Sequence, residues 1–370
     1  MRPACEVAGV LDQWWSEDRL SGFNTWQIRT LRAIKDCRTL TLGGHIDHCS
    51  SCGHLRISYN SCRNRHCPKC QGHKRIHWIV SRESELLDVP YFHVVFTLPD
   101  ALHTLAMFQP GLIYATLFKA AWQTVQAFAG KHRKAAMISI LHTWGQNLNL
   151  HPHIHCIIPG GTTDHHLRWQ YTRSKGKFLY PIKALSKVFR AKYVALLRQK
   201  IQLDTTLSEN LFLTPWVVYA KRPFGSPASV IEYLGRYTHK VAITNHRILA
   251  IGEGTVTFSY KDYKQGATVK TMTLTQDEFV RRFALHILPK GFVRIRHYGF
   301  LSSSWKKTKL PNLQSKLNKN PLNKSPPATK IHRCPLCKTG VLKTICTFDR
   351  RGPPYRYTKA NDQQTTAPAT

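Results

Sequence analysis

Residues 151–161 read HPHIHCIIPGG, an apolar run that carries three histidines and stops at two glycines. Residues 136–144 (AMISILHTW) form a second apolar run, and the polar residues 145–149 separate the two. This pattern predicts two strands, which we expect to pair antiparallel. Because side chains alternate along a strand, His153 and His155 lie on one face, whereas Ile154 and Cys156 point towards the core.

Other segments surround this pair with strands and helices. The patterns predict strands at 91–98, 216–220, 256–260 and 269–274, and helices within 1–36 and at 111–131, 186–202, 227–240 and 276–286. We therefore expect an α+β fold, in which a central antiparallel sheet carries the histidine pair and helices flank it.

The charge balance narrows the class of partner. The chain has 370 residues, with 54 Lys and Arg against 20 Asp and Glu, and a formal net charge of +34. A globular protein this positive repels itself, and a polyanionic partner is the usual reason. Nucleic acid is the first candidate and an anionic membrane surface the alternative. No apolar run of about 18 residues and no secretory signal is present, so we expect a cytoplasmic protein.

Cysteine is clustered with histidine. Six of the 11 cysteines fall between Cys37 and Cys70, which in a reducing compartment indicates metal rather than disulfides. The pairs Cys49-x-x-Cys52 and Cys67-x-x-Cys70 are separated by fourteen residues, a spacing typical of one zinc site of four thiolates. The chain thus divides into a helical, zinc-binding module at 1–80, a main domain at 88–300, and a basic linker and tail at 301–370.

Other side chains in the cysteine-rich stretch allow two interpretations. A second zinc could be held by the remaining potential ligands, which are Cys37, His45, Cys62 and His66. Alternatively, the two cysteines are small buried side chains and the histidines contact phosphate. The cations Arg63, Arg65 and Lys69 either contact a phosphate backbone or form a solvated basic face. A further Cys-x-x-Cys pair at 334–337 is ambiguous by itself.

The histidine pair predicts half of a divalent metal site. If the two strands pair antiparallel, the amide oxygen of Gln146 approaches the same ion as a third ligand to His153 and His155. Such a set carries no negative charge, which leaves Mg²⁺ or Mn²⁺ with its full charge and open positions for phosphate oxygens. The alternative is a polar solvent face that happens to carry two histidines.

Two tyrosines provide candidate nucleophiles. Ser226 and Pro227 predict the start of a helix, on which Tyr233 and Tyr237 lie four residues apart and share a face. A phenol needs a nearby cation or metal before it reacts as phenolate. Ordinary packing would equally explain two tyrosines at this spacing.

Six longer motifs share one resemblance. They are NSCRNRHCPKCQG at 60–72, HVVFTLP at 93–99, HPHIH at 151–155, WVVYAKRPFG at 216–225, YLGRYTHKVAITNHRI at 233–248 and RRFALHILPKGFVRIRHYG at 281–299. In sequence and order they resemble the two-tyrosine transposases of the insertion-sequence ninety-one family, which belong to the HUH endonuclease superfamily. The resemblance covers about residues 29–301, most of the chain.

The resemblance implies an HUH-type sheet and rolling-circle transposition. Such enzymes cut single-stranded DNA at the ends of the element, where a tyrosine captures the 5′ phosphate and a 3′ hydroxyl is released. On the matching motifs, His153 and His155 would be metal ligands and Tyr233 and Tyr237 the nucleophiles. The family's zinc module matches residues 37–70 and would help to recognise DNA. The location would be bacterial-type, cytoplasmic and nucleoid-associated.

Further cations are candidates for DNA contacts. Arg222, Arg236 and Lys240 would bind phosphate, and the aromatic and basic run at 294–298, with Arg294 and Arg296, would clamp unpaired bases. Two other classes stay open: a plasmid replication initiator or relaxase with the same chemistry, and a noncatalytic zinc-dependent nucleic-acid-binding protein.

Overall fold

The computed structural model describes most of the chain. The described residues are 3–71, 78–79, 81–173, 178–221, 224, 229–230, 233, 235, 238, 240–317, 333–355 and 357. Their main feature is a five-stranded sheet in the order β12-β4-β5-β3-β8, in which every neighbouring pair is antiparallel. The bounds are β3 (Tyr91–Thr97), β4 (Ala136–Trp144), β5 (Leu150–Pro159), β8 (Val218–Ala220) and β12 (Ile295–Gly299). The predicted α+β fold is confirmed, and β5, which carries the histidine pair, is the central strand.

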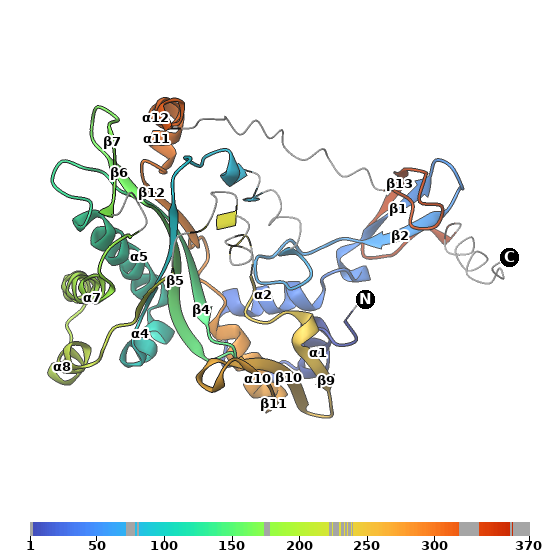
Figure 1. Cartoon of the computed structure of the whole chain (residues 1–370). Coiled ribbons are helices and arrows are strands. Elements are labelled where there is room, and N and C mark those ends of the chain that lie inside the picture. Colours follow the sequence, from blue (N-terminus) through green and yellow to red (C-terminus); the bar gives the residue numbers. More distant parts are fainter. Residues whose placement is uncertain are drawn as a thin grey trace.

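Helices cover one face of this sheet (Figure 1). Val94, Phe96 and Ile154 from the sheet pack in one core with Leu117 and Phe189 from the helices. The elements on this side are α4 (His103–Phe108), α5 (Pro110–Ala127), α7 (Ile182–Arg198) and α8 (Thr205–Leu213). Nearly every residue of β4 and β5 is buried because both faces of the sheet are covered.

The opposite face carries a smaller core beside the histidines. Ile138, Ile140 and Ile157 pack there with Leu310 and Leu313. The two leucines belong to α12 (Leu310–Leu317), which follows α11 (Ser303–Thr308), in a stretch expected to be a linker. That expectation is wrong for 303–317, because leucines three apart give the basic segment a buried side.

The N-terminal helices pack against a second sheet. α1 (Val7–Trp14) and α2 (Thr25–Lys35) share a core with the β11-β10-β9 sheet and with α10 (Gln276–Leu285). The Trp14 indole Nε1 donates to Asp277 at 2.6 Å across this junction. The strands are β9 (Ile248–Ile251), β10 (Thr255–Asp262) and β11 (Thr268–Thr275). Since this core joins residues from 7–67 to residues from 242–287, the three-part division of the chain stays a prediction.

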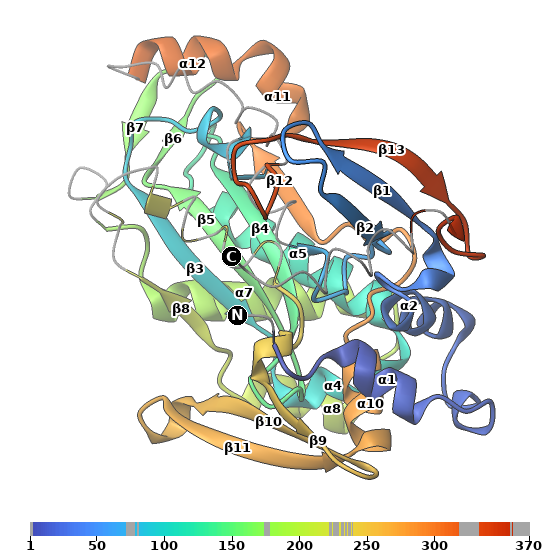
Figure 2. The ribbon, with the colours of Figure 1, turned by 90° about the vertical axis from the view of Figure 1, so that its right-hand side faces the viewer.

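A three-stranded sheet projects from the body of the molecule in Figure 1, and Figure 2 shows its three strands side by side. Its order is β13-β1-β2, with β1 (Gly44–Cys49), β2 (Leu55–Tyr59) and β13 (Leu342–Phe348). Both neighbouring pairs are antiparallel, so a strand from the tail completes a hairpin from the cysteine-rich stretch. The remaining strands are β6 (Gly161–Thr163) and β7 (Trp169–Tyr171), which pair with each other. In the described part of the chain, no helix has the length and apolar character of a membrane span.

Candidate catalytic and metal sites

Three histidines meet on the sheet face opposite α5. His142 on β4 is the direct cross-strand partner of His153 on β5, and His155 lies two residues further along. Candidate ligand atoms of His142, His153 and His155, called here the imidazole cluster, lie within 4.8 Å of one another. His142 and His155 are buried and His153 is half-buried. Neighbouring strands thus fix three imidazoles by backbone register alone.

The expected third ligand, Gln146, lies between His142 and His153 in the chain. Gln146 lies beyond the end of β4 in the turn to β5, where its carbonyl accepts a hydrogen bond from Arg247. Strand pairing brings His142 opposite His153, four residues before Gln146 in the chain. The imidazole of His142 therefore lies with those of His153 and His155, and the role of Gln146 as a ligand stays a prediction.

A second layer of contacts orients the cluster. The Nδ1 atom of His155 lies 2.8 Å from Nε2 of His93 on β3, and the two rings stack with centroids 5.1 Å apart. The Nδ1 atom of His153 donates to the carbonyl of His151 at 2.6 Å. With both Nδ1 atoms engaged, Nε2 is the ligand atom that these tautomers assign to His153 and His155.

Burial keeps these imidazoles neutral. It lowers the pKa of His153 to about 3 and that of His93 to about 4, and it holds the pKa of His155 well below its usual range. A neutral imidazole keeps the lone pair that metal coordination needs. The donor set therefore fits a divalent cation, and it leaves the ion's positive charge to be balanced by an anionic substrate.

A second group of candidate metal ligands lies beside the imidazole cluster, nearer the surface. Candidate ligand atoms of Asp100, His103 and His151 form a second trio within 4.8 Å of one another. The ring of His151 lies 5.1 Å from that of His153, centroid to centroid. The Asp100 side chain is 91% exposed, so this trio is an open and solvated extension of the cluster.

The ring of Tyr233 lies beside that of His93, the histidine that contacts His155. Its ring centroid is 5.2 Å from that of His93, with the planes at 68°. Phe224 packs against the same ring at 5.1 Å, and the Lys221 Nζ lies 5.2 Å from the ring centroid. One candidate nucleophile is therefore in contact with a histidine that contacts the cluster. Tyr237, Arg222 and Arg236 lie outside the described residues.

Two arginines predicted to contact DNA make internal contacts. Arg294 donates to the carbonyls of Leu141 at 3.0 Å and Lys240 at 2.8 Å, and burial lowers its pKa to about 9. The guanidinium of Arg296 lies 4.3 Å from the ring centroid of Phe118. The run expected to clamp bases forms strand β12 at the sheet edge. In these contacts both arginines stabilise that edge.

The eight clustered thiols divide differently from the expected arrangement. The first cysteine cluster consists of Cys37, Cys62, Cys67 and Cys70, and the second cysteine cluster of Cys49, Cys52, Cys334 and Cys337. Within each cluster, candidate atoms lie within 4.8 Å of one another. The expected grouping of Cys49 and Cys52 with Cys67 and Cys70 is therefore wrong. Spacing along the chain could not reveal that the tail supplies the partners of the first pair.

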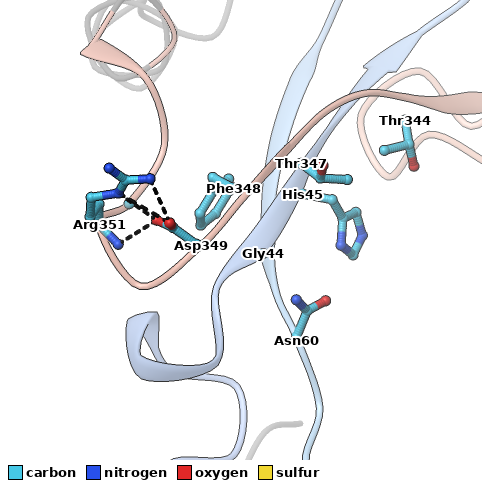
Figure 3. Close-up of a pocket in the computed structure, with 9 residues that line it drawn as sticks. Gly44, His45, Asn60, Thr344, Thr347, Phe348, Asp349 and Arg351 are labelled. Carbon is cyan, nitrogen blue, oxygen red and sulfur yellow. Dashed lines mark hydrogen bonds and ion pairs between the residues drawn. The ribbon is translucent and has the colours of Figure 1, made fainter.

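The two histidines expected at a second zinc lie elsewhere. His45 is on β1, with Nε2 at 3.5 Å from Asp47, and it lines an open pocket of about 790 Å³ together with Asn60 and Thr347 (Figure 3). His66 is buried, and burial holds its pKa well below the usual range. Neither histidine joins a cysteine cluster, because thiols complete both sets of four.

The cations of the first cysteine cluster have different surroundings. Arg65 donates to the carbonyls of Phe292 at 2.5 Å and Pro289 at 3.1 Å, which fastens the cysteine-rich stretch to the main domain. Lys69 pairs with Glu6 at 2.5 Å. Arg63 is exposed. Phosphate contact by these three cations stays a prediction.

The sequence contains weaker signals for the candidate site residues that the prediction missed. His142 lies near the end of the apolar run at 136–144, and His93 opens the motif HVVFTLP. Both become evident once the register of β3, β4 and β5 is known. The Cys334 and Cys337 pair had the correct spacing, but its partners are Cys49 and Cys52, far away in the chain.

Comparison with known proteins identifies relatives of the chain. Two family models match the chain, one described as "Putative transposase" over residues 136–309 and one described as "Transposase zinc-binding domain" over residues 9–98. The "Putative transposase y4qJ" of Sinorhizobium fredii (strain NBRC 101917 / NGR234) is 40% identical over 391 residues, covering 95% of this chain and 98% of that protein. The "Transposase for insertion sequence element IS801" of Pseudomonas savastanoi pv. phaseolicola is 26% identical over 341 residues, covering 86% and 80%. No solved structure matches the chain.

The two matched ranges contain the imidazole cluster, the first cysteine cluster and half of the second. The transposase model covers β4 and β5 with the imidazole cluster, and the zinc-binding model covers the first cysteine cluster. The zinc-binding domain and the cysteine clusters support structural zinc, and a transposase has DNA as its partner. The chain belongs to the insertion-sequence ninety-one family of transposases.

Proposed function

We propose that this transposase cuts and rejoins single-stranded DNA through a covalent bond between a tyrosine and a 5′ phosphate, in rolling-circle transposition. One observation carries the proposal. The ring of Tyr233 lies against His93, and His93 is hydrogen-bonded to His155 in the imidazole cluster. A nucleophile and a cation-binding cluster this close support chemistry on a phosphodiester.

The imidazole cluster would hold Mg²⁺ or Mn²⁺ through His142, His153 and His155. When bound, such an ion polarises a phosphoryl oxygen and offsets the charge that develops in the transition state. The protein's own part is orientation. His93 and the carbonyl of His151 fix two of the imidazoles, while buried strands hold all three on one face.

The covalent step exchanges one phosphorus–oxygen bond for another. The phenol oxygen of Tyr233 attacks the phosphorus and gives up its proton to water, while the bond to the 3′ oxygen breaks. That oxygen takes up a proton and leaves as a 3′ hydroxyl, so the products are a free 3′ end and a 5′-phosphotyrosine. Lys221, 5.2 Å from the ring centroid, favours the negative charge that develops on the phenol. Tyr237 would serve the second of two such steps.

The test is a search for the covalent adduct. Purified protein is incubated with end-labelled DNA carrying the element's end sequence, as single strand and as duplex, with Mg²⁺, Mn²⁺ or a chelator. We expect an adduct with the single strand and a cation, and its loss in the Tyr233→Phe/Tyr237→Phe double variant. Tyr219→Phe on β8, 54% exposed, is the matched control and should keep the adduct.

Other outcomes would favour the rival classes. Binding of DNA without an adduct under every condition would contradict the proposal and favour a noncatalytic zinc-dependent binding protein. An adduct formed on a plasmid origin or transfer sequence, with none on the element's ends, would instead favour a replication initiator or relaxase.

A further inference from the structure

The second cysteine cluster joins two distant parts of the chain. The Sγ atoms of Cys49 and Cys337 lie 3.7 Å apart, and those of Cys52 and Cys334 lie 3.8 Å apart. A tetrahedron of thiolates about 2.3 Å from a central zinc has edges of about 3.8 Å. A disulfide would instead need about 2.05 Å between the sulfurs. The spacing of the four thiols is therefore that of a zinc site.

The two halves of this cluster have the same local fold. Gly53 N–H donates to the carbonyl of Cys49 at 3.2 Å, and Lys338 N–H donates to that of Cys334 at 3.0 Å. Gly53 and Lys338, each directly after the second cysteine of its pair, both have positive φ, at 70° and 61°. Each Cys-x-x-Cys segment therefore closes the same tight turn and directs both thiols inward.

Backbone groups support the thiols. Ser51 N–H donates to Cys49 Sγ at 3.5 Å, and Gly340 N–H donates to Cys337 Sγ at 3.3 Å. A Cβ atom at Gly340 would lie 2.3 Å from Cys49 Sγ, so only glycine lets the tail approach the thiol this closely. Donors of this kind stabilise thiolate charge, and thiolates are the zinc ligands.

Hydrophobic packing alone is a weak reason for the tail to dock here. The core cluster at this junction contains only Cys49, Cys334 and Leu342, with Cys337 packed against it. In the described residues, the three large cores contain none from 333–357. Small units with so little core usually need a metal or a cross-link.

We propose that Cys49, Cys52, Cys334 and Cys337 bind a second structural zinc, which fastens the tail to the cysteine-rich stretch and completes the β13-β1-β2 sheet. This site extends beyond the matched zinc-binding domain, because half of its ligands follow residue 98. It does not depend on the cleavage chemistry proposed above.

The test is the zinc content of the full chain, purified under reducing conditions. We expect two zinc ions per chain in the wild type and one in Cys334→Ser/Cys337→Ser. Cys346→Ser is the matched control, because Cys346 is a half-buried thiol on β13 outside the cluster, and it should keep two. The zinc retained by the first cysteine cluster shows that the double variant is folded there.

A second measurement follows the tail itself. A protease site is inserted between residues 317 and 333 of the full chain, and the chain is cut after purification. We expect the tail fragment to stay bound until a strong chelator is added. One zinc per wild-type chain, two in the double variant, or a mass lower by four hydrogens with disulfides in place of zinc would each overturn the proposal.

Discussion

The imidazole cluster and the second cysteine cluster are assembled in opposite ways. His142, His153 and His155 come from two paired strands joined by one short turn, so their arrangement is a by-product of the sheet. Cys49 and Cys337 are 288 residues apart, and a small separate sheet brings them together. Paired strands hold the first arrangement, whereas the proposed ion would contribute stability to the second.

Substitutions in the two clusters should therefore have different effects. Loss of a ligand from the imidazole cluster should reduce the rate and leave the fold unchanged, because buried strands hold the remaining ligands. Loss of support for the second cysteine cluster should loosen the tail and leave the cleavage rate nearly unchanged. Three substitutions test this contrast.

The largest effect is expected from His142→Ala. Removing one of three ligands forfeits several kcal/mol of transition-state stabilisation, so the cleavage rate should fall roughly a thousandfold. The measurement is single-turnover cleavage of labelled single-stranded DNA, with DNA binding followed in parallel. His103→Ala, in the neighbouring open trio, is the control and should stay within a few-fold of the wild type. Equal losses in both variants would contradict the assignment of His142.

A smaller effect is expected from His93→Ala. His93 contacts His155 but belongs to the second layer, where substitutions typically cost about 10- to 100-fold in metal affinity or activity. The Mn²⁺ concentration for half-maximal cleavage should rise, and His93→Gln, which keeps a hydrogen-bonding group, should recover part of the loss. A rate loss with unchanged Mn²⁺ dependence would mean that His93 does not act through the cation site.

The smallest effect on cleavage is expected from Gly340→Ala. The added Cβ would press on Cys49 Sγ and on Ser51 Oγ, at 2.3 and 2.8 Å. One of the two zinc ions should therefore pass to a competing chelator several-fold faster, with no change in cleavage rate. Gly22→Ala, where nothing lies within 4 Å of the added atom, is the control. Unchanged zinc release would show that the tail does not approach the thiol as described.

The predictions were most accurate for elements that depend on residues close together in the chain. Strands β4 and β5 and the helix α10 followed from local periodicity, and the central position of the histidine pair is confirmed. His142 was missed because its face depends on the register between strands rather than on its own neighbours.

Distant pairings were harder to predict. Three Cys-x-x-Cys pairs allow several sets of four, and spacing favoured the two pairs nearest in the chain over the correct partners. Arg65 and Arg294 were predicted to contact DNA because charge is visible in a sequence. The carbonyls that engage them belong to other elements of the fold.

The position of β13 beside β1 has a consequence for synthesis. Ser50 forms hydrogen bonds with Val341, which the ribosome adds 291 residues later. The β1-β2 hairpin therefore emerges with the outer edge of β1 unpaired, and that edge stays unpaired while the five-stranded sheet is made. Exposed edges invite pairing with other strands. The β13-β1-β2 sheet can thus be completed only after all strands of the five-stranded sheet have been synthesised, and a prematurely terminated chain lacks the strand that pairs with β1.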